Sequence, residues 1–210
     1  MTRRDNVSRE PGALELPAES HIFDEVNMEQ TIKDIKKELR AAMNGILSAR
    51  MREVGMPYKL AFGVELPRLQ EIADEFPHDR MLAQSLWNEN IRECKILACM
   101  LMPKEDFTAE LADVWSEEIT TPEMAQVMVA YLLRHTVHAA ETAFRWIASG
   151  NTYQQLCGFL CLARCLRDGA ILDERSATEL RDQAESLLQH ASLHLRKSIM
   201  AALDALEAKQ

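Results

Sequence analysis

Two histidine pairs are the residues of this sequence whose spacing best suits metal binding. His135 and His138 lie three residues apart with Glu141 following, and His190 and His194 lie four residues apart. Imidazoles at such helical spacing can share one face and bind zinc. Neither pair forms the HExxH pattern of a zinc hydrolase. We therefore expect no metal site and no cofactor. The sequence also offers no glycine-rich phosphate loop for a nucleotide cofactor, and no Ser or Cys stands in a recognisable nucleophile motif.

The five cysteines are the other candidates for chemistry. Cys157, Cys161 and Cys165 recur every fourth residue, whereas Cys94 and Cys99 stand apart. Thiolate metal sites usually use CxxC pairs carried on loops, while a free cysteine on a helix packs as a small hydrophobic residue. The odd number of cysteines predicts free thiols in a reducing compartment. Because the sequence shows neither an apolar signal core nor an apolar run long enough to span a membrane, we expect a cytoplasmic protein without membrane contact.

Composition and charge restrict the fold and the partners. The chain has 210 residues, of which 47% are hydrophobic and 27% charged, with only 7 Gly and 7 Pro. These values, with long stretches of helical periodicity, predict an all-α protein. The net charge of −9 argues against strong DNA binding, because DNA-binding surfaces are usually basic. The negative charge is uneven: residues 105–123 contain seven acids and no base, whereas residues 132–210 contain as many bases as acids.

The helices that must position these residues are most evident over residues 82–101. Leu82, Leu86 and Trp87 share one helical face, residues 88–90 suit a turn, and a second apolar stripe follows. One such pair encloses too little core, so similar pairs must stack on either side. The sequence thus predicts a HEAT-like helical-repeat solenoid, an alpha-alpha superhelix, with Trp87 in its core. Glu93 and Lys95, in the first turn of the second helix, are predicted to clamp the neighbouring repeat.

The rest of the chain divides into a lead-in and one domain. Residues 1–27 are polar and contain proline, which predicts a mobile segment, and residues 28–210 form a single helical-repeat domain. One long helix is predicted from Met28 to about Glu53, with Ile35, Leu39 and Met43 facing inward. Further helices are predicted over residues 67–76, 106–115, 121–134, 137–148, 152–166, 176–189 and 192–207.

Three of these helices carry clear start signals. Thr121 before a proline and a glutamate suits a helix cap followed by the first helical position. Thr152 with Gln155, and Ser176 with Glu179, have the spacing of a capping box.

Several short stretches form a combination that is recognisable together. They are Phe62-Gly63-Val64 with Pro67-x-Leu69 and Ile72-Ala73, Leu82-x3-Leu86-Trp87, Ile91-Arg92-Glu93-x-Lys95-x-Leu97-Ala98, Trp115, and Leu195-Arg196-Lys197-Ser198-Ile199. Together they resemble the bacterial AlkD-type DNA alkylation repair proteins over roughly residues 55–208. The resemblance implies a concave DNA cradle of HEAT-like repeats. It also implies relatives that are glycosylases, which remove alkylated purines. In that family a carboxylate stabilises the cationic sugar, and an arginine and two tryptophans complete the site, the aromatic rings facing the cationic lesion and the deoxyribose.

The chain departs from the family at each of these positions. The substitutions are as follows: the W-x-x-x-D motif becomes Thr121 to Ala125, the arginine becomes Leu156, the second tryptophan becomes Ala201, and a following arginine becomes Asp204. Two other side chains are fallbacks, namely Glu123 for the missing carboxylate and Arg145 for the missing arginine.

Three functions therefore stay open. The first is a catalytically degenerate relative, a pseudoenzyme that binds duplex or damaged DNA or a protein partner. The second is an active glycosylase for alkylated purines that uses Glu123, although the acidic run 105–123 would repel phosphate near its site. The third is a protein-interaction scaffold with no nucleic-acid role. The candidate nucleic-acid or partner-binding residues are Trp115, Gln126, Arg145, Arg196 and Lys197.

Overall fold

The fold is a row of helices, seen in a computed structural model that describes residues 18–208, with side chains described from residue 27. The elements are α1 (Ala18–Ala41), α2 (Gly45–Glu53), α3 (Leu66–Asp74), α4 (Arg80–Trp87), α5 (Arg92–Leu101), α6 (Ala109–Glu117), α7 (Pro122–Tyr131), the 3-10 helix η1 (Leu133–His135), α8 (Ala139–Ile147), α9 (Thr152–Arg167), α10 (Glu174–Leu188) and α11 (Leu193–Glu207). Within the described residues the one β feature is an isolated bridge between Leu60 and Ile91. The predicted all-α class is confirmed.

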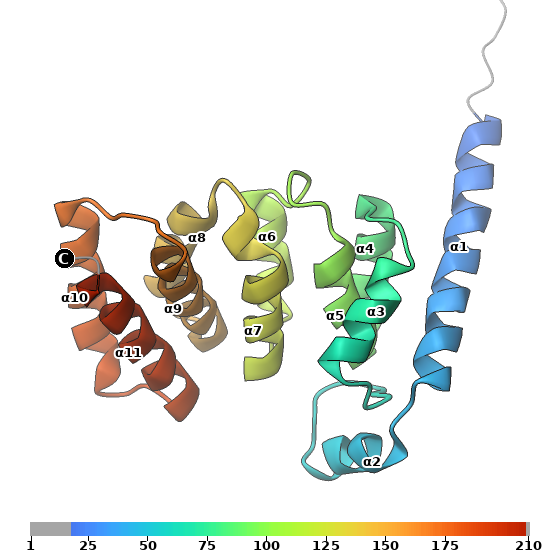
Figure 1. Cartoon of the computed structure of the whole chain (residues 1–210), viewed down its shortest axis with the longest axis horizontal. Helices are drawn as coiled ribbons and strands as arrows, with labels where there is room; N and C mark the ends of the chain where they lie inside the picture. The colour runs from blue at the N-terminus through green and yellow to red at the C-terminus, as the bar shows by residue number, and fades with distance from the viewer. Residues whose placement is uncertain (1–17, 209–210) are drawn as a thin grey trace, which may run out of the picture.

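The helices stack in pairs along an arc. Helices α4 and α5, α8 and α9, and α10 and α11 pack as pairs, while α5, α7, α9 and α11 pack in succession as a second layer. Figure 1 shows the pairs side by side from α4 to α11, with α10 and α11 at one end of the row and α1 at the other. Each pair buries its apolar faces only against its neighbours, which is the organisation of a solenoid.

Helix α5 is the most enclosed element. All ten of its residues, from Arg92 to Leu101, are buried, because α3, α4 and α7 pack around it. Beside it, the rings of Trp87 and Trp115 stack with centroids 4.2 Å apart and planes 3° apart. Trp87 is 1% exposed, so its predicted place in the core is confirmed.

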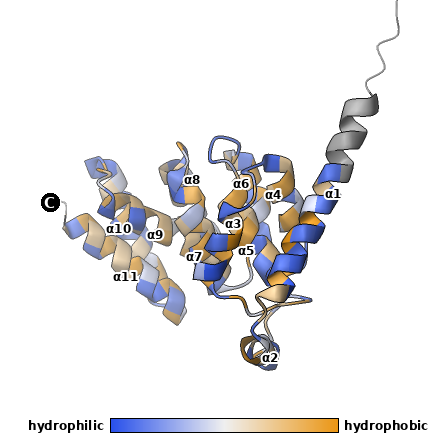
Figure 2. Ribbon diagram, turned by 45° about the vertical axis from the view of Figure 1, so that its right-hand side comes forward, coloured by the Kyte–Doolittle hydropathy of each residue, from blue (hydrophilic) through white to orange (hydrophobic). Residues whose placement is uncertain are grey.

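The predicted helix from Met28 to Glu53 is wrong in two respects. The chain is already helical from Ala18, and the helix ends at Ala41. A second helix then starts at Gly45, because the Asn44 side chain accepts a hydrogen bond from the Leu47 N–H and caps it. Met43 is 54% exposed and does not face inward. Figures 1 and 2 show α2 lying apart from the row of paired helices. Residues 1–17 of the predicted lead-in lie outside the described residues.

Helix starts differ from the predictions at three places. The caps of α9 and α10 are Asn151 and Asp173 rather than Thr152 and Ser176, and each accepts hydrogen bonds from the first turn of its helix. Helix α6 starts later than predicted because Thr108 caps it. The predicted cap Thr121 is confirmed, since its Oγ1 accepts the Met124 N–H at 3.2 Å.

Close backbone packing joins α8 to α9. A Cβ atom added at Gly158 would lie 2.6 Å from the Ala143 carbonyl oxygen and 2.7 Å from Ile147 Cγ1. Only glycine allows this approach, so Gly158 sets the distance between the two helices. Among the described residues, none of the helices is long and apolar enough to cross a membrane.

Candidate functional site

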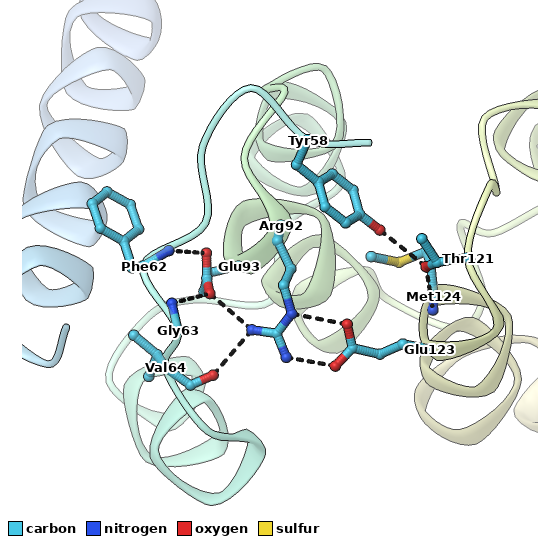
Figure 3. Close-up of polar contacts among 9 residues, drawn as sticks. All are labelled: Tyr58, Phe62, Gly63, Val64, Arg92, Glu93, Thr121, Glu123 and Met124. Carbon is cyan, nitrogen blue, oxygen red and sulfur yellow. Dashed lines mark hydrogen bonds and ion pairs between the residues drawn. The ribbon is translucent and has the colours of Figure 1, made fainter. Parts of the chain in front are cut away.

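A buried charged network at the start of α5 joins three parts of the chain. The Glu93 carboxylate is 0% exposed and accepts the backbone N–H groups of Phe62 and Gly63, each at 2.9 Å. Gly63 has φ +74°, and a Cβ there would lie 2.6 Å from the Asn44 carbonyl oxygen, so the loop needs glycine at this position. Figure 3 shows the carboxylate between this loop and Arg92. Glu93 therefore clamps the preceding segment, as the sequence predicted.

Arg92 carries the network across to α7. Its guanidinium donates to the Val64 carbonyl at 3.1 Å and to Glu93 at 2.8 Å. It also donates twice to Glu123, from Nε to Oε2 at 2.8 Å and from Nη2 to Oε1 at 2.5 Å. Burial alone would lower the pKa of Arg92, but the hydrogen bonds and charges of the two carboxylates outweigh it and raise that pKa. Both Glu123 oxygens thus bind one guanidinium (Figure 3).

The positions that the resemblance assigns to the family's catalytic residues lie on α7, α9 and α11. Ala125 is 0% exposed and Leu156 is 3% exposed, so both side chains belong to the core. Ala201 is half-buried and Asp204 is exposed on α11. Glu123 lies two residues before Ala125, and Arg92 binds its carboxylate.

Two of the sequence-predicted binding residues are engaged in other contacts. Trp115 is 2% exposed, because Trp87 covers one face of its ring and Phe107 lies 5.3 Å away, centroid to centroid. Its role as a contact for nucleic acid stays a prediction, and in this structure neighbouring rings enclose the side chain. Arg145 forms an ion pair with Asp113 of α6, and its role in place of the missing arginine stays a prediction.

The other three predicted binding residues are exposed but not gathered together. Gln126 lies on α7, whereas Arg196 and Lys197 lie in the first turn of α11. Arg196 donates from Nη2 to the Leu188 carbonyl at 3.3 Å. Their exposure is compatible with binding a partner, and their role stays a prediction.

Three arginines that the sequence analysis did not single out do converge. Arg134 of η1 donates from Nη1 to Asp168 Oδ2 at 2.7 Å, and Asp168 caps α9 directly after Arg167. Arg164 lies one turn before Asp168 on the same face of α9. The i,i+3 spacing of Arg164 and Arg167 is visible in the sequence. The approach of Arg134 depends on how η1 packs against α9, which no local pattern encodes.

The cysteines fall into two groups. Burial raises the pKa of Cys94 and of Cys99 to about 12 and also raises that of Cys157, so these three thiols are inert. Cys165 is half-buried, and its Sγ lies 4.0 Å from that of Cys161. A hydrogen bond from the Cys161 thiol lowers the pKa of Cys165 to about 7. All five are free, and the described residues hold no group of three side chains suited to a metal.

Comparison with known proteins identifies the fold and a family. A sequence model described as DNA alkylation repair enzyme matches residues 35–209. Among solved structures, the chain is similar to a member of a family related to the HEAT-like repeat DNA glycosylases with affinity for branched DNA structures. That likeness has a TM-score of 0.73 at 17% identity and covers 83% of this chain and 74% of the other. It confirms the HEAT-like array. No curated protein matches the sequence.

Proposed function

The chain belongs to the DNA alkylation repair enzyme family, and on that premise we propose that it binds DNA without excising alkylated bases. The structurally similar protein comes from a family with affinity for branched DNA structures. We therefore propose junction and duplex DNA as the partners to test. DNA binding and base excision depend on different residues, so the first can be kept where the second is lost.

The pairing of Glu123 with Arg92 is the observation that carries this proposal. A glycosylase accelerates base loss by placing unneutralised negative charge where the sugar becomes cationic. Here both oxygens of Glu123 accept hydrogen bonds from one guanidinium. Such a bidentate pair is among the stronger polar contacts in proteins, and it cancels the charge that the reaction needs. The carboxylate stabilises the fold instead.

The remaining catalytic positions support the same conclusion. Ala125 and Leu156 are buried apolar residues and provide neither a carboxylate nor a guanidinium. Trp115 is enclosed by its aromatic neighbours, so its ring does not present a face to a lesion. Loss of one preorganised electrostatic group typically lowers a rate by about 10²–10³. Loss of several would remove detectable excision.

Two measurements on the full chain test the proposal. The first is release of methylated bases from alkylated duplex DNA, and we expect none above the spontaneous rate. Release by the wild-type protein that is lost in Glu123→Gln would overturn the proposal and make the chain a glycosylase. Because that variant also weakens the pair with Arg92, its fold is checked by circular dichroism in the same experiment.

The second measurement is a fluorescence-anisotropy titration of a four-way junction and a matched duplex at increasing salt. We expect binding that weakens as salt rises, because phosphate contacts release counterions. Reversal of charge at both Arg196 and Lys197 tests the positions that resemble the family's basic residues, and we expect it to weaken binding. Absence of binding to both DNA forms at low salt would reject the DNA-binding role and favour a protein-interaction scaffold.

A further inference from the structure

The C-terminal end of α9 gathers positive charge from two elements. Arg164 and Arg167 occupy its last turn, and Arg134 reaches it from η1 through the ion pair with Asp168. Arg167 extends the other way, donating from Nη2 to the Ala201 carbonyl of α11 at 3.4 Å. The three guanidinium groups thus cover the end of α9 between η1 and α11. We call Arg134, Arg164 and Arg167 the arginine cluster.

The cluster carries more positive charge than its surroundings balance. Among the described residues, Asp168 is the one acid that forms an ion pair with the cluster, and it pairs with Arg134. In the part of the chain that the structure describes, Arg164 has no carboxylate within ion-pair distance. Burial, together with the charges of Arg134 and Arg167, lowers the pKa of Arg164. Burial and the charge of Arg134 also lower the pKa of His135 on η1.

Helix electrostatics alone does not explain this arrangement. Basic residues in the last turn of a helix interact favourably with its negative end. Arg167, which is exposed, is sufficient for that interaction. That effect does not require a third arginine from η1. It also does not explain why Arg164 is half-buried beside two like charges, which is unfavourable without an anion. A bound anion would remove the repulsion.

Resting on the DNA binding proposed above, we propose that the arginine cluster is a binding site for phosphates of the DNA backbone. Guanidinium groups bind phosphate in a planar, bidentate geometry, and three of them suit one or two adjacent phosphates. The chain has a net charge of −9, so long-range attraction to DNA is weak. A local site in which one acid, Asp168, faces three guanidinium groups is therefore where backbone contacts are expected.

The cluster lies close along the chain to Leu156 and to Gln126. Leu156, Leu160 and Arg164 follow one another every four residues along α9, so Arg164 lies about 12 Å beyond Leu156 along the helix axis. Arg134 donates from Nε to the Ala130 carbonyl at 3.1 Å, one turn beyond the exposed Gln126. The cluster therefore lies about two helical turns beyond Leu156 along α9, and we expect it to hold backbone rather than a base.

The test compares four proteins in the anisotropy titration with junction DNA. The variant Arg164→Gln with Arg167→Gln removes two charges and leaves the Arg134–Asp168 pair in place. The matched control is Arg175→Gln, which removes an exposed arginine from the first turn of α10. The variant Arg164→Lys with Arg167→Lys keeps the charge and removes the planar fork. Circular dichroism of each variant establishes that the fold is retained.

We expect the double Gln variant to bind about tenfold more weakly, with the slope of log K against log salt reduced by about 1.8, since each lost phosphate contact contributes about 0.9. The control should bind as the wild type does, and the Lys variant should keep the wild-type slope.

If the wild type binds and the double Gln variant matches it in affinity and slope, the cluster is not the site, although the proposed function stands. If the wild type binds no DNA, the proposed function itself fails. Arginine-dependent binding of poly-glutamate without DNA binding would overturn the inference in favour of an acidic protein partner.

Discussion

Removal of the Arg92 guanidinium is the perturbation whose effect follows most directly from the structure. In Arg92→Ala, the Glu93 carboxylate stays 0% exposed and keeps two backbone donors but loses its one cation. Breaking a buried ion pair by removing one partner typically costs about 3–5 kcal/mol, and we expect Arg92→Ala to lower the free energy of unfolding by that amount. Glu123 is 33% exposed at its side chain, so Glu123→Ala should cost less, about 1–3 kcal/mol.

A double-mutant cycle measured by urea denaturation isolates the pair. The variant with both changes should lose less stability than the sum of the single changes, leaving a coupling energy of about 1–3 kcal/mol, because residues in direct contact are not additive. Glu117→Gln is the control, since Glu117 is exposed and forms no ion pair in the described residues, and its unfolding midpoint should not move. A coupling energy below about 0.5 kcal/mol would refute the argument that Glu123 stabilises the fold. Glu123 would then again be a candidate for the catalytic carboxylate.

Three further outcomes follow from packing and from one thiol. Trp87→Ala should lower the free energy of unfolding by about 3–5 kcal/mol, because it leaves a cavity beside Trp115, and a loss below about 1 kcal/mol in urea denaturation would contradict its place in the core. Gly158→Ala should cost about 1–3 kcal/mol, because the added Cβ meets the α8 backbone; Gly150→Ala, where a Cβ meets nothing within 4 Å, is the matched control for thermal unfolding and should not destabilise. Cys165 should react with iodoacetamide at a rate that rises with pH through a midpoint near 7, because the thiolate is the nucleophile and its fraction grows above the pKa. In Cys161→Ala that midpoint should move upward, and an unchanged midpoint would show that the neighbouring thiol is not its cause.

Helical periodicity was sufficient to predict the pairs and their stacking. The apolar stripes around Trp87 place that ring in the core from sequence alone. Glu93 and Lys95, in the first turn of the following helix, were predicted to clamp the neighbouring repeat. Lys95 does bind the Trp87 carbonyl at 2.7 Å and Glu118 at 2.6 Å. These predictions succeed because they depend on residues close in sequence or on the need to bury one face of a helix.

The errors concern contacts between segments far apart in the chain. The apolar pattern continues from Ile35 past Met43, so it does not reveal the break at Asn44, which also donates its N–H to the Phe62 carbonyl. Trp115 was named as a candidate binding residue, and the sequence did not reveal that stacking on Trp87 encloses its ring. The pairing of Glu123 with Arg92 and the approach of Arg134 to α9 depend on how successive repeats are oriented, and one sequence does not encode that locally.

Complete burial of α5 affects how the chain can open. Its amide hydrogens meet solvent only when α4 or α7 moves away, so they should exchange at the rate of global unfolding. Helices α10 and α11 end the row and have neighbours on one side only, so their amides can exchange through fraying of the terminal pair. Protection from exchange should therefore be greatest at α5 and fall toward α11. The segment that carries Arg92 is the last to open, whereas the C-terminal pair can adjust to a bound partner without disturbing it.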